Sequence, residues 1–309
     1  MRRDRPSLSS DTALDQATRQ PASPPFGPTH DRRHMLLAGL AALPISLLGG
    51  LMGLGGAEFR LPVLAGLLRY TARQAVPLNL AVSLITLATA LLSRSGSLSF
   101  AALAPFAVAI LAMIAGGVTA AFFGAALGSR LANEQLERVI LVLLVAIGAA
   151  LLVEGFLPQQ VPGLLPRSTL AHLAAGVLFG LAIGLVSSLL GVAGGELIIP
   201  TMLFVFGADI KTAGTASLLI GLPTVAVGIV RYARRGALSD RQALRATVLP
   251  MGLGSVLGAL LGGALVGLVP AAALKIGLGL VLIWSAQRIF RHTRSATATA
   301  HEPSAIPRG

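Results

Sequence analysis

The sequence predicts an all-α polytopic membrane protein made of two homologous four-helix repeats. Of the 309 residues, 54% are hydrophobic and only 12% are charged, about half the charged share of a soluble domain. Apolar segments of the roughly 20 residues that one bilayer crossing requires recur along the chain. One glycine-rich pattern, GLGGAEFRLP at 53–62, returns as GVAGGELIIP at 191–200. Composition and repetition together define this fold class.

Eight long apolar segments are expected to be transmembrane helices. They cover residues 35–54, 76–93, 102–127, 136–157, 169–192, 212–231, 244–268 and 271–290. Two further apolar segments, 61–70 and 197–207, are too short to cross alone, because at about 1.5 Å per residue they reach only half the hydrocarbon thickness. We therefore expect two short re-entrant or broken helices, one in each repeat.

Composition also divides the chain into domains. Residues 1–34 are polar and rich in Pro, Ser and Arg, which predicts a disordered basic N-terminal tail. The first transmembrane repeat is expected at 35–157, a linker at 158–168, the second repeat at 169–292 and a loose C-terminal tail at 293–309.

The duplication rests on one register, because a single constant offset places four residues of the first pattern on identical residues of the second. These pairs are Gly53 and Gly191, Gly56 and Gly194, Glu58 and Glu196, and Pro62 and Pro200. Glycine matches alone would be weak evidence in a chain with 36 glycines, but the glutamate and proline matches are less common. The two segments are therefore expected to be equivalent.

The basic residues predict the orientation. They lie mainly at 1–34, at 231–245 and after residue 288, outside the apolar spans, which is typical of the cytoplasmic side. Re-entrant short segments give eight spans in two parallel repeats, and segment length favours this topology. Completed crossings give ten spans in two inverted repeats, and the arginines of the first half favour that alternative. We adopt eight spans, and both topologies place the two termini in the cytoplasm.

Two glutamates are the strongest functional signal. Of the twelve acidic residues, only Glu58 and Glu196 lie within apolar surroundings, where an ionisable residue costs about 2.5–3.5 kcal/mol. The neighbouring glycines loosen the helix and expose backbone amides, which attract anions at a helix start. Short Gly- or Pro-interrupted segments in both repeat halves are typical of a transporter's substrate site.

The predicted site draws on both repeats. Its substrate-binding residues are Glu58, Glu196, Gly55, Gly56, Gly194, Gly195, Asn79, Thr215 and Ser217, and its helix-breaking residues are Pro62 and Pro200. A structural alternative exists for each kind of residue: glycines permit close helix packing, a glutamate can cap a helix, and Asn79 or Ser217 can bond across helices. Arg60, whose repeat mate is Ile198, could pair with Glu58, face an anion or reach the membrane interface.

These motifs resemble a known family. The segments GGELIIP and LGGAEFRLP look like the glycine run, acidic residue and proline of the TauE/SafE sulfite exporter family, and the resemblance covers about residues 35–291. It implies a multi-pass permease of the inner membrane that moves sulfite, sulfoacetate, related sulfonates or other organic anions. Ala57 and Arg60 make the first copy the weaker match, so Glu196 is the safer candidate.

The predicted function is secondary transport of a small anion, with protons as a possible coupling ion. A carboxylate beside an anion site is compatible with binding if it is protonated when the anion binds. An anion channel and a non-transporting scaffold are the alternatives. The chain has no cysteine, no metal-ligand cluster, no GxSxG motif and no GxxxxGK[ST] motif, so we expect no enzyme, metal or cofactor. The basic residues form no stripe interleaved with aromatic residues, so nucleic acid is not an expected partner.

Overall fold

The protein is an all-α bundle whose long helices are apolar enough to cross a membrane. The structure, a computed structural model, describes residues 31–127, 145, 149, 152–153, 163–166, 168–281 and 283–284. Within these residues six helices qualify as membrane spans by length and composition, which confirms the predicted fold class. The predicted span 136–157 and most of the two predicted tails lie outside the described residues.

The helices of the first half follow the predicted order. They are α2 (Arg32–Met52), α3 (Ala57–Pro62), the π-helix η1 (Val63–Leu67), α4 (Ala72–Ser97), the 3₁₀-helix η2 (Phe100–Phe106) and α5 (Ala107–Leu127). The second half contains α7 (Thr169–Leu190), α8 (Gly195–Pro200), η3 (Thr201–Val205), α9 (Ile210–Arg234), α10 (Arg241–Ala243), η4 (Leu244–Val248) and α11 (Leu249–Leu265). A further apolar helix covers Ala271–Val281.

Equivalent short elements begin at matched positions of the two halves, as the sequence register requires. Helices α3 and α8 begin at Ala57 and Gly195, and the π-helices that continue them begin at Val63 and Thr201. In both halves a proline, Pro62 or Pro200, is the last residue before the π-helix. The matched bounds support the predicted duplication.

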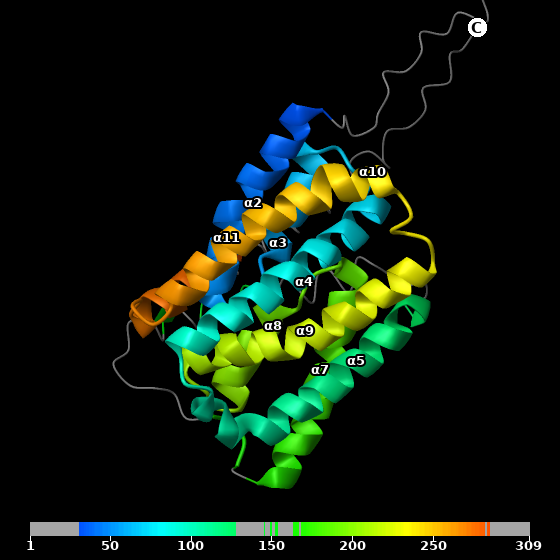
Figure 1. The fold of residues 1–309 in the computed structure, drawn as a ribbon. Coiled ribbons are helices and arrows are strands. Elements are labelled where there is room, and N and C mark those ends of the chain that lie inside the picture. Colours follow the sequence, from blue (N-terminus) through cyan, green and yellow to red (C-terminus); the bar gives the residue numbers. More distant parts are fainter. Residues whose placement is uncertain are drawn as a thin grey trace, which may run out of the picture.

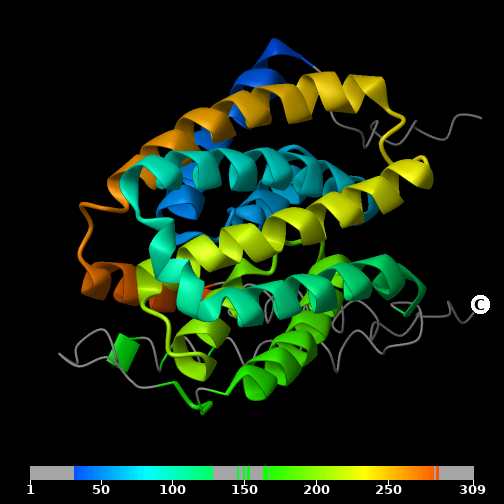
Figure 2. The ribbon, with the colours of Figure 1, turned by 60° about the horizontal axis from the view of Figure 1, so that its bottom comes forward.

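The helices of the two halves are interleaved. Helix α2 packs along α11 and α5 packs along α7, so each half contributes one member of each outer pair. Between these pairs, α4 and α9 cross the centre of the bundle, and Figure 2 shows α11, α4, α9 and α5 lying side by side in that order. The duplicated halves therefore form one bundle rather than two domains.

Glycines set the close approach of the outer pairs. A β-carbon on Gly254, Gly258 or Gly262 of α11 would lie 2.2 Å from a carbonyl oxygen of α2. On the other side, a β-carbon on Gly180 of α7 would lie 2.5 Å from the carbonyl oxygen of Met113 in α5. These contacts are typical of small residues at helix interfaces in membranes.

The helix directions show that the two halves are inverted. Arg94 near the end of α4 bonds Gly50 near the end of α2, and His34 near the start of α2 lies against Tyr70 just before α4, so these two helices run the same way. The same Arg94 bonds Thr215 near the start of α9, and Gly228 toward the end of α9 lies against Leu80 toward the start of α4, so α9 runs opposite to α4. Gly180 of α7 lies against Met113 and Gly184 against Gly117, which places α7 parallel to α5. Helix α5 in turn runs parallel to α9, because contacts between them advance along both helices together.

This arrangement matches the ten-span alternative rather than the parallel repeats that segment length favoured. Because α2 and α4 run the same way, α3 and η1 must carry the chain back between them. The length argument was misleading for a physical reason. A β-carbon on Gly56 would lie 2.9 Å from the carbonyl oxygen of Ile45, seven residues before the end of α2, so the short helix begins inside the bundle and needs less than the full hydrocarbon thickness to return.

Apolar side chains cover the outside of the bundle. Leu40 of α2, Leu111 of α5, Leu178 of α7 and Leu253 of α11 are each more than 60% exposed. Polar side chains, among them Asn79, Ser83, Thr86 and Ser255, are instead buried. Apolar outside and polar inside is the distribution expected for a multi-pass protein surrounded by lipid.

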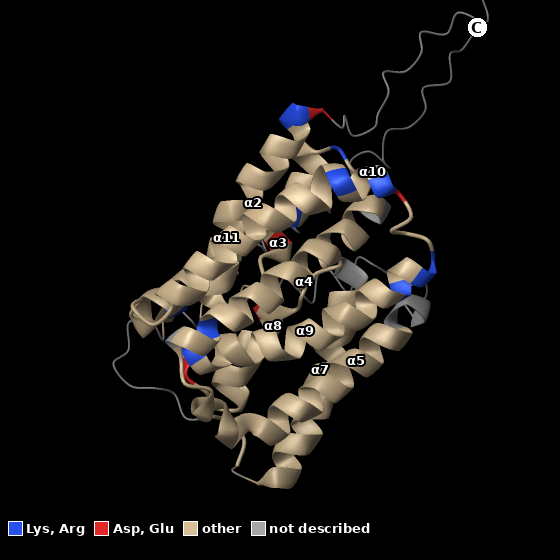
Figure 3. Cartoon of the chain, viewed as in Figure 1, with Lys and Arg blue, Asp and Glu red and all other residues tan. Residues whose placement is uncertain are grey.

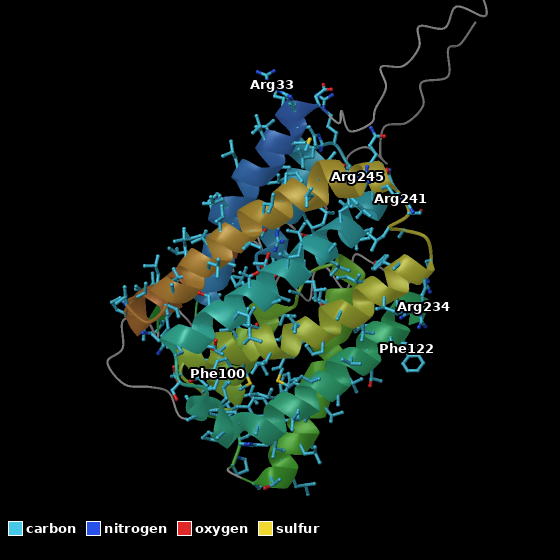
Figure 4. All side chains as sticks on the ribbon, in the orientation of Figure 1. Arg33, Phe100, Phe122, Arg234, Arg241 and Arg245 are labelled. Carbon is cyan, nitrogen blue, oxygen red and sulfur yellow. The ribbon has the colours of Figure 1, made fainter. Side chains whose placement is uncertain are left out.

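Most of the described basic residues gather at one end of the bundle, and a few lie at the other end. Figure 3 shows Lys and Arg around the start of α2, around α10 and at the end of α9, while the acidic residues on α3 and α8 lie inside. We call this end the basic face, and its exposed basic residues are Arg32, Arg33, Arg69, Arg234, Arg235, Arg241 and Arg245. Figure 4 labels four of them along this edge and Phe100 toward the other end, which we call the opposite face.

Candidate functional site

The two glycine turns meet at the centre of the bundle. The first turn, residues 53–56, has positive φ at Gly53, Gly55 and Gly56, and the second turn, residues 191–194, has it at Gly191 and Gly194. Glycine adopts this backbone conformation without strain. A β-carbon on Gly195 would lie 2.9 Å from the backbone of Leu54, and one on Gly55 would lie 3.5 Å from the β-carbon of Ala193. The turns are therefore in contact across the repeat interface.

Each turn also packs on the central helix of the other half. A β-carbon on Gly53 would overlap the backbone of Gly214 in α9, and one on Gly191 would overlap the side chain of Val76 in α4. Val76 and Gly214 are themselves repeat mates, related by the same offset as Gly53 and Gly191. We call each glycine turn, together with the short helix that follows it, a half-site. The two half-sites are related by the same symmetry as the repeats, and α4 and α9 position them.

Asn79 connects the two half-sites directly. Its side-chain amide donates hydrogen bonds to the carbonyl oxygen of Ala57, at 3.0 Å, and to that of Gly191, at 3.1 Å. Ala57 begins α3 in the first half and Gly191 opens the second turn. The Oδ1 atom of Asn79 is buried without a hydrogen-bond partner in the described part of the chain. Asn79 therefore serves the cross-helix role predicted for it and still presents an acceptor.

Ser217, the repeat mate of Asn79, lies on the other side of the same junction. A β-carbon on Gly195 would come within 3.1 Å of the Ser217 hydroxyl oxygen. The side chain is 1% exposed, and its hydroxyl has no hydrogen-bond partner among the described residues. Buried hydroxyl groups are normally paired, so an unpaired hydroxyl at this junction is consistent with a ligand contact.

Each of the two glutamates lies just past its glycine turn. Glu58 is the second residue of α3, and Glu196 is the second residue of α8. Glu196 is 8% exposed. Both carboxylate oxygens of Glu58 are buried and have no hydrogen-bond partner within the described segments. The N-cap residues of the two helices are Gly56 and Gly194, which have no side chain to cap the helix start.

Thr215 lies apart from the unpaired groups, although it was predicted to belong to the site. Its hydroxyl donates to the carbonyl oxygen of Lys211 at 2.9 Å and accepts from Arg94 at 3.0 Å. Its hydrogen-bonding capacity is therefore used within the protein, near the opposite face. The structure brings the other predicted residues together around the two turns.

Arg94 is a functional candidate that the sequence prediction missed. Its guanidinium donates to the carbonyl oxygens of Gly50 and Leu51 at the end of α2, and to Lys211 and Thr215 of α9. The residue is 1% exposed. Arg94 thus joins the two halves at the opposite face. In the sequence it is followed by Ser-Gly-Ser, which gave no sign that its side chain would be buried.

The basic face has small cavities. Tyr232, near the end of α9, lines one cavity together with Arg231, Ser187 and Thr224. A second cavity shares Ser187 and Thr224 and reaches Ala193 in the second glycine turn. The two cavities thus share lining residues, and one of them reaches the second glycine turn.

The fold and the site together define a class of protein. Paired broken helices that meet at mid-depth between inverted repeats are the architecture of membrane transporters. A family profile described as Sulfite exporter TauE/SafE matches residues 9–151 and 176–308. The chain belongs to the sulfite exporter TauE/SafE family and is a multi-pass membrane transporter rather than an enzyme. No curated protein and no solved structure matches it significantly.

Proposed function

We propose that this protein is a secondary transporter for sulfite or a small organosulfonate, and that proton movement is coupled to anion movement. One observation carries the proposal beyond family membership. The two glycine turns touch, Asn79 bonds to both half-sites, and each turn leads into a glutamate. Polar atoms that lack partners are concentrated at this junction, on Glu58, Asn79 and Ser217.

The chemistry of the junction suits a small oxyanion. Ser217 offers a hydroxyl donor, and the apolar surroundings strengthen a hydrogen bond to a charged oxygen. A glutamate beside the anion must be protonated to avoid like-charge repulsion. A proton that enters with the anion and leaves with it would couple the two fluxes.

The proposed orientation places the basic face in the cytoplasm. Exposed arginines gather at that face, and the opposite face has only buried or partly buried basic residues among those described, Arg94, Lys211 and Lys275. This bias follows the positive-inside rule. The cavities lined by Arg231 and Tyr232 would then give the anion access from the cytoplasm, with Arg94 closing the periplasmic side of an inner-membrane protein.

A reconstituted flux screen tests this proposal. Purified protein in proteoliposomes is assayed for uptake of sulfite, sulfoacetate and acetate, with and without a pH gradient. We expect saturable uptake of a sulfur oxyanion that a proton gradient accelerates, and little uptake of acetate. Flux that does not saturate would identify a channel, and the absence of sulfite and sulfoacetate flux would contradict the proposal.

A further inference from the structure

Arg60 is a buried cation in the first half-site, and hydrogen bonds to the first glycine turn hold it there. The residue is 0% exposed. Its Nε donates to the carbonyl oxygen of Gly56 at 3.3 Å, and its Nη2 donates to the carbonyl oxygen of Gly55. The side chain therefore bends back toward the turn instead of extending to the membrane interface.

One nitrogen of this guanidinium is left unused. Nη1 of Arg60 is buried and has no hydrogen-bond partner in the segments that the structure describes. Glu58 lies two residues earlier on the same short helix, and its carboxylate oxygens also lack partners. The two opposite charges attract each other electrostatically, but no hydrogen bond joins them in the described segments. A buried charge that is not fully paired is costly. The simplest explanation for the unpaired Nη1 of Arg60 is that this atom contacts a ligand.

We propose that Arg60 is the cationic residue that binds the transported anion, an inference that rests on the proposed function. The carbonyl oxygens of Gly55 and Gly56 fix the guanidinium, and Nη1 is then available for one oxygen of a sulfite or sulfonate group. Arginine suits this role because its guanidinium stays charged when buried and donates in a planar geometry that matches oxyanions. A protonated Glu58 would supply a second donor to the same group.

The proposal makes the two half-sites unequal. The repeat mate of Arg60 is Ile198, which is 2% exposed and contributes to the hydrophobic core. The anion would therefore bind closer to the first turn, while the second turn contributes Glu196 and the adjoining Ser217. Within the described residues no counterpart cation is present on α8, so a single anion per chain is expected.

The test is equilibrium binding of sulfite to the purified protein in detergent, together with the KM of sulfite uptake. Arg60→Gln keeps an amide donor for the turn carbonyls but removes the charge, and we expect it to weaken sulfite binding by about 10- to 100-fold. Arg60→Lys keeps the charge without the planar fork and should weaken binding less. Arg234→Ala, which removes an exposed arginine of the basic face, is the matched control and should bind normally.

The outcomes separate the two proposals. Sulfite affinity within about twofold of the wild type in both Arg60 variants would overturn the role of Arg60 while leaving the transport function intact. Sulfite affinity that falls in the order wild type, Arg60→Lys, Arg60→Gln, in variants that elute as the wild type does on size exclusion, would support it. If the wild type neither binds nor transports sulfite or sulfoacetate, the proposed function fails first and this inference fails with it.

Discussion

Replacing Glu196 with glutamine is expected to abolish proton-driven accumulation of the anion while leaving the protein folded. Glutamine has the shape of protonated glutamic acid and keeps hydrogen-bonding capacity, but it cannot release a proton. Glu196 is 8% exposed and lies in the first turn of the short helix that follows the second glycine turn. The variant should therefore bind the anion as if permanently protonated and lose the coupling step.

Two assays separate coupling from binding in this variant. Anion exchange between equal concentrations on the two sides needs no net proton movement and should continue in Glu196→Gln proteoliposomes. Accumulation driven by a pH gradient should fall to the level of empty liposomes. Glu58→Gln, measured in parallel, shows whether the two half-sites share the role. Gradient-driven accumulation at the wild-type rate in Glu196→Gln would contradict the coupling role.

Replacing Arg94 with alanine is expected to destabilise the transporter more than any other single loss of charge considered. The substitution leaves the carbonyl oxygens of Gly50, Leu51 and Lys211 without this donor in a buried setting. The Lys211 carbonyl keeps the Thr215 hydroxyl as a donor, whereas each buried group left unsatisfied costs about 1–3 kcal/mol, so we expect the lost contacts to Gly50 and Leu51 to cost at least about 2 kcal/mol. Thermal unfolding in detergent, followed by size-exclusion recovery, measures it.

Arg231 provides the control for this prediction. It donates one hydrogen bond, to the carbonyl oxygen of Ala121 at 2.9 Å, and it lies near the basic face in a partly exposed position. Arg231→Ala should therefore lower the unfolding temperature much less than Arg94→Ala. Equal losses in the two variants would mean that the buried contacts at the opposite face contribute little to stability.

The positions of the elements could largely be predicted from the sequence. Segments predicted at 76–93 and 212–231 correspond to α4 and α9, and the short segments at 61–70 and 197–207 correspond to the broken helices. Apolar length and the repeat register carry this information because burial in lipid requires nearly every residue of a span to be apolar. The boundaries of the predicted tails and linker stay predictions.

The direction of the short segments and the contacts of the site could not be predicted in the same way. Segment length indicates re-entry only if the segment starts at the membrane surface, whereas the turn before α3 lies beside Ile45, inside the bundle. The register paired Asn79 with Ser217 but gave no sign that Asn79 bonds to Gly191 of the other half. The burial of Arg60 and Arg94 could not be predicted, because it depends on carbonyl groups that only the folded turns and helix ends present.

The central claim is that the anion binds where the two glycine turns meet, and the KM of sulfite uptake by Ser217→Ala tests it most directly. The Ser217 hydroxyl is buried and has no partner in the described structure, so its removal should not disturb folding. If it contacts the anion, the KM should rise by about 10-fold or more with little change in the amount of folded protein. Ser83→Ala, which removes a hydroxyl that bonds the carbonyl oxygen of Asn79 within α4, should leave the KM near the wild-type value. An unchanged KM in folded Ser217→Ala would contradict a binding site at this junction.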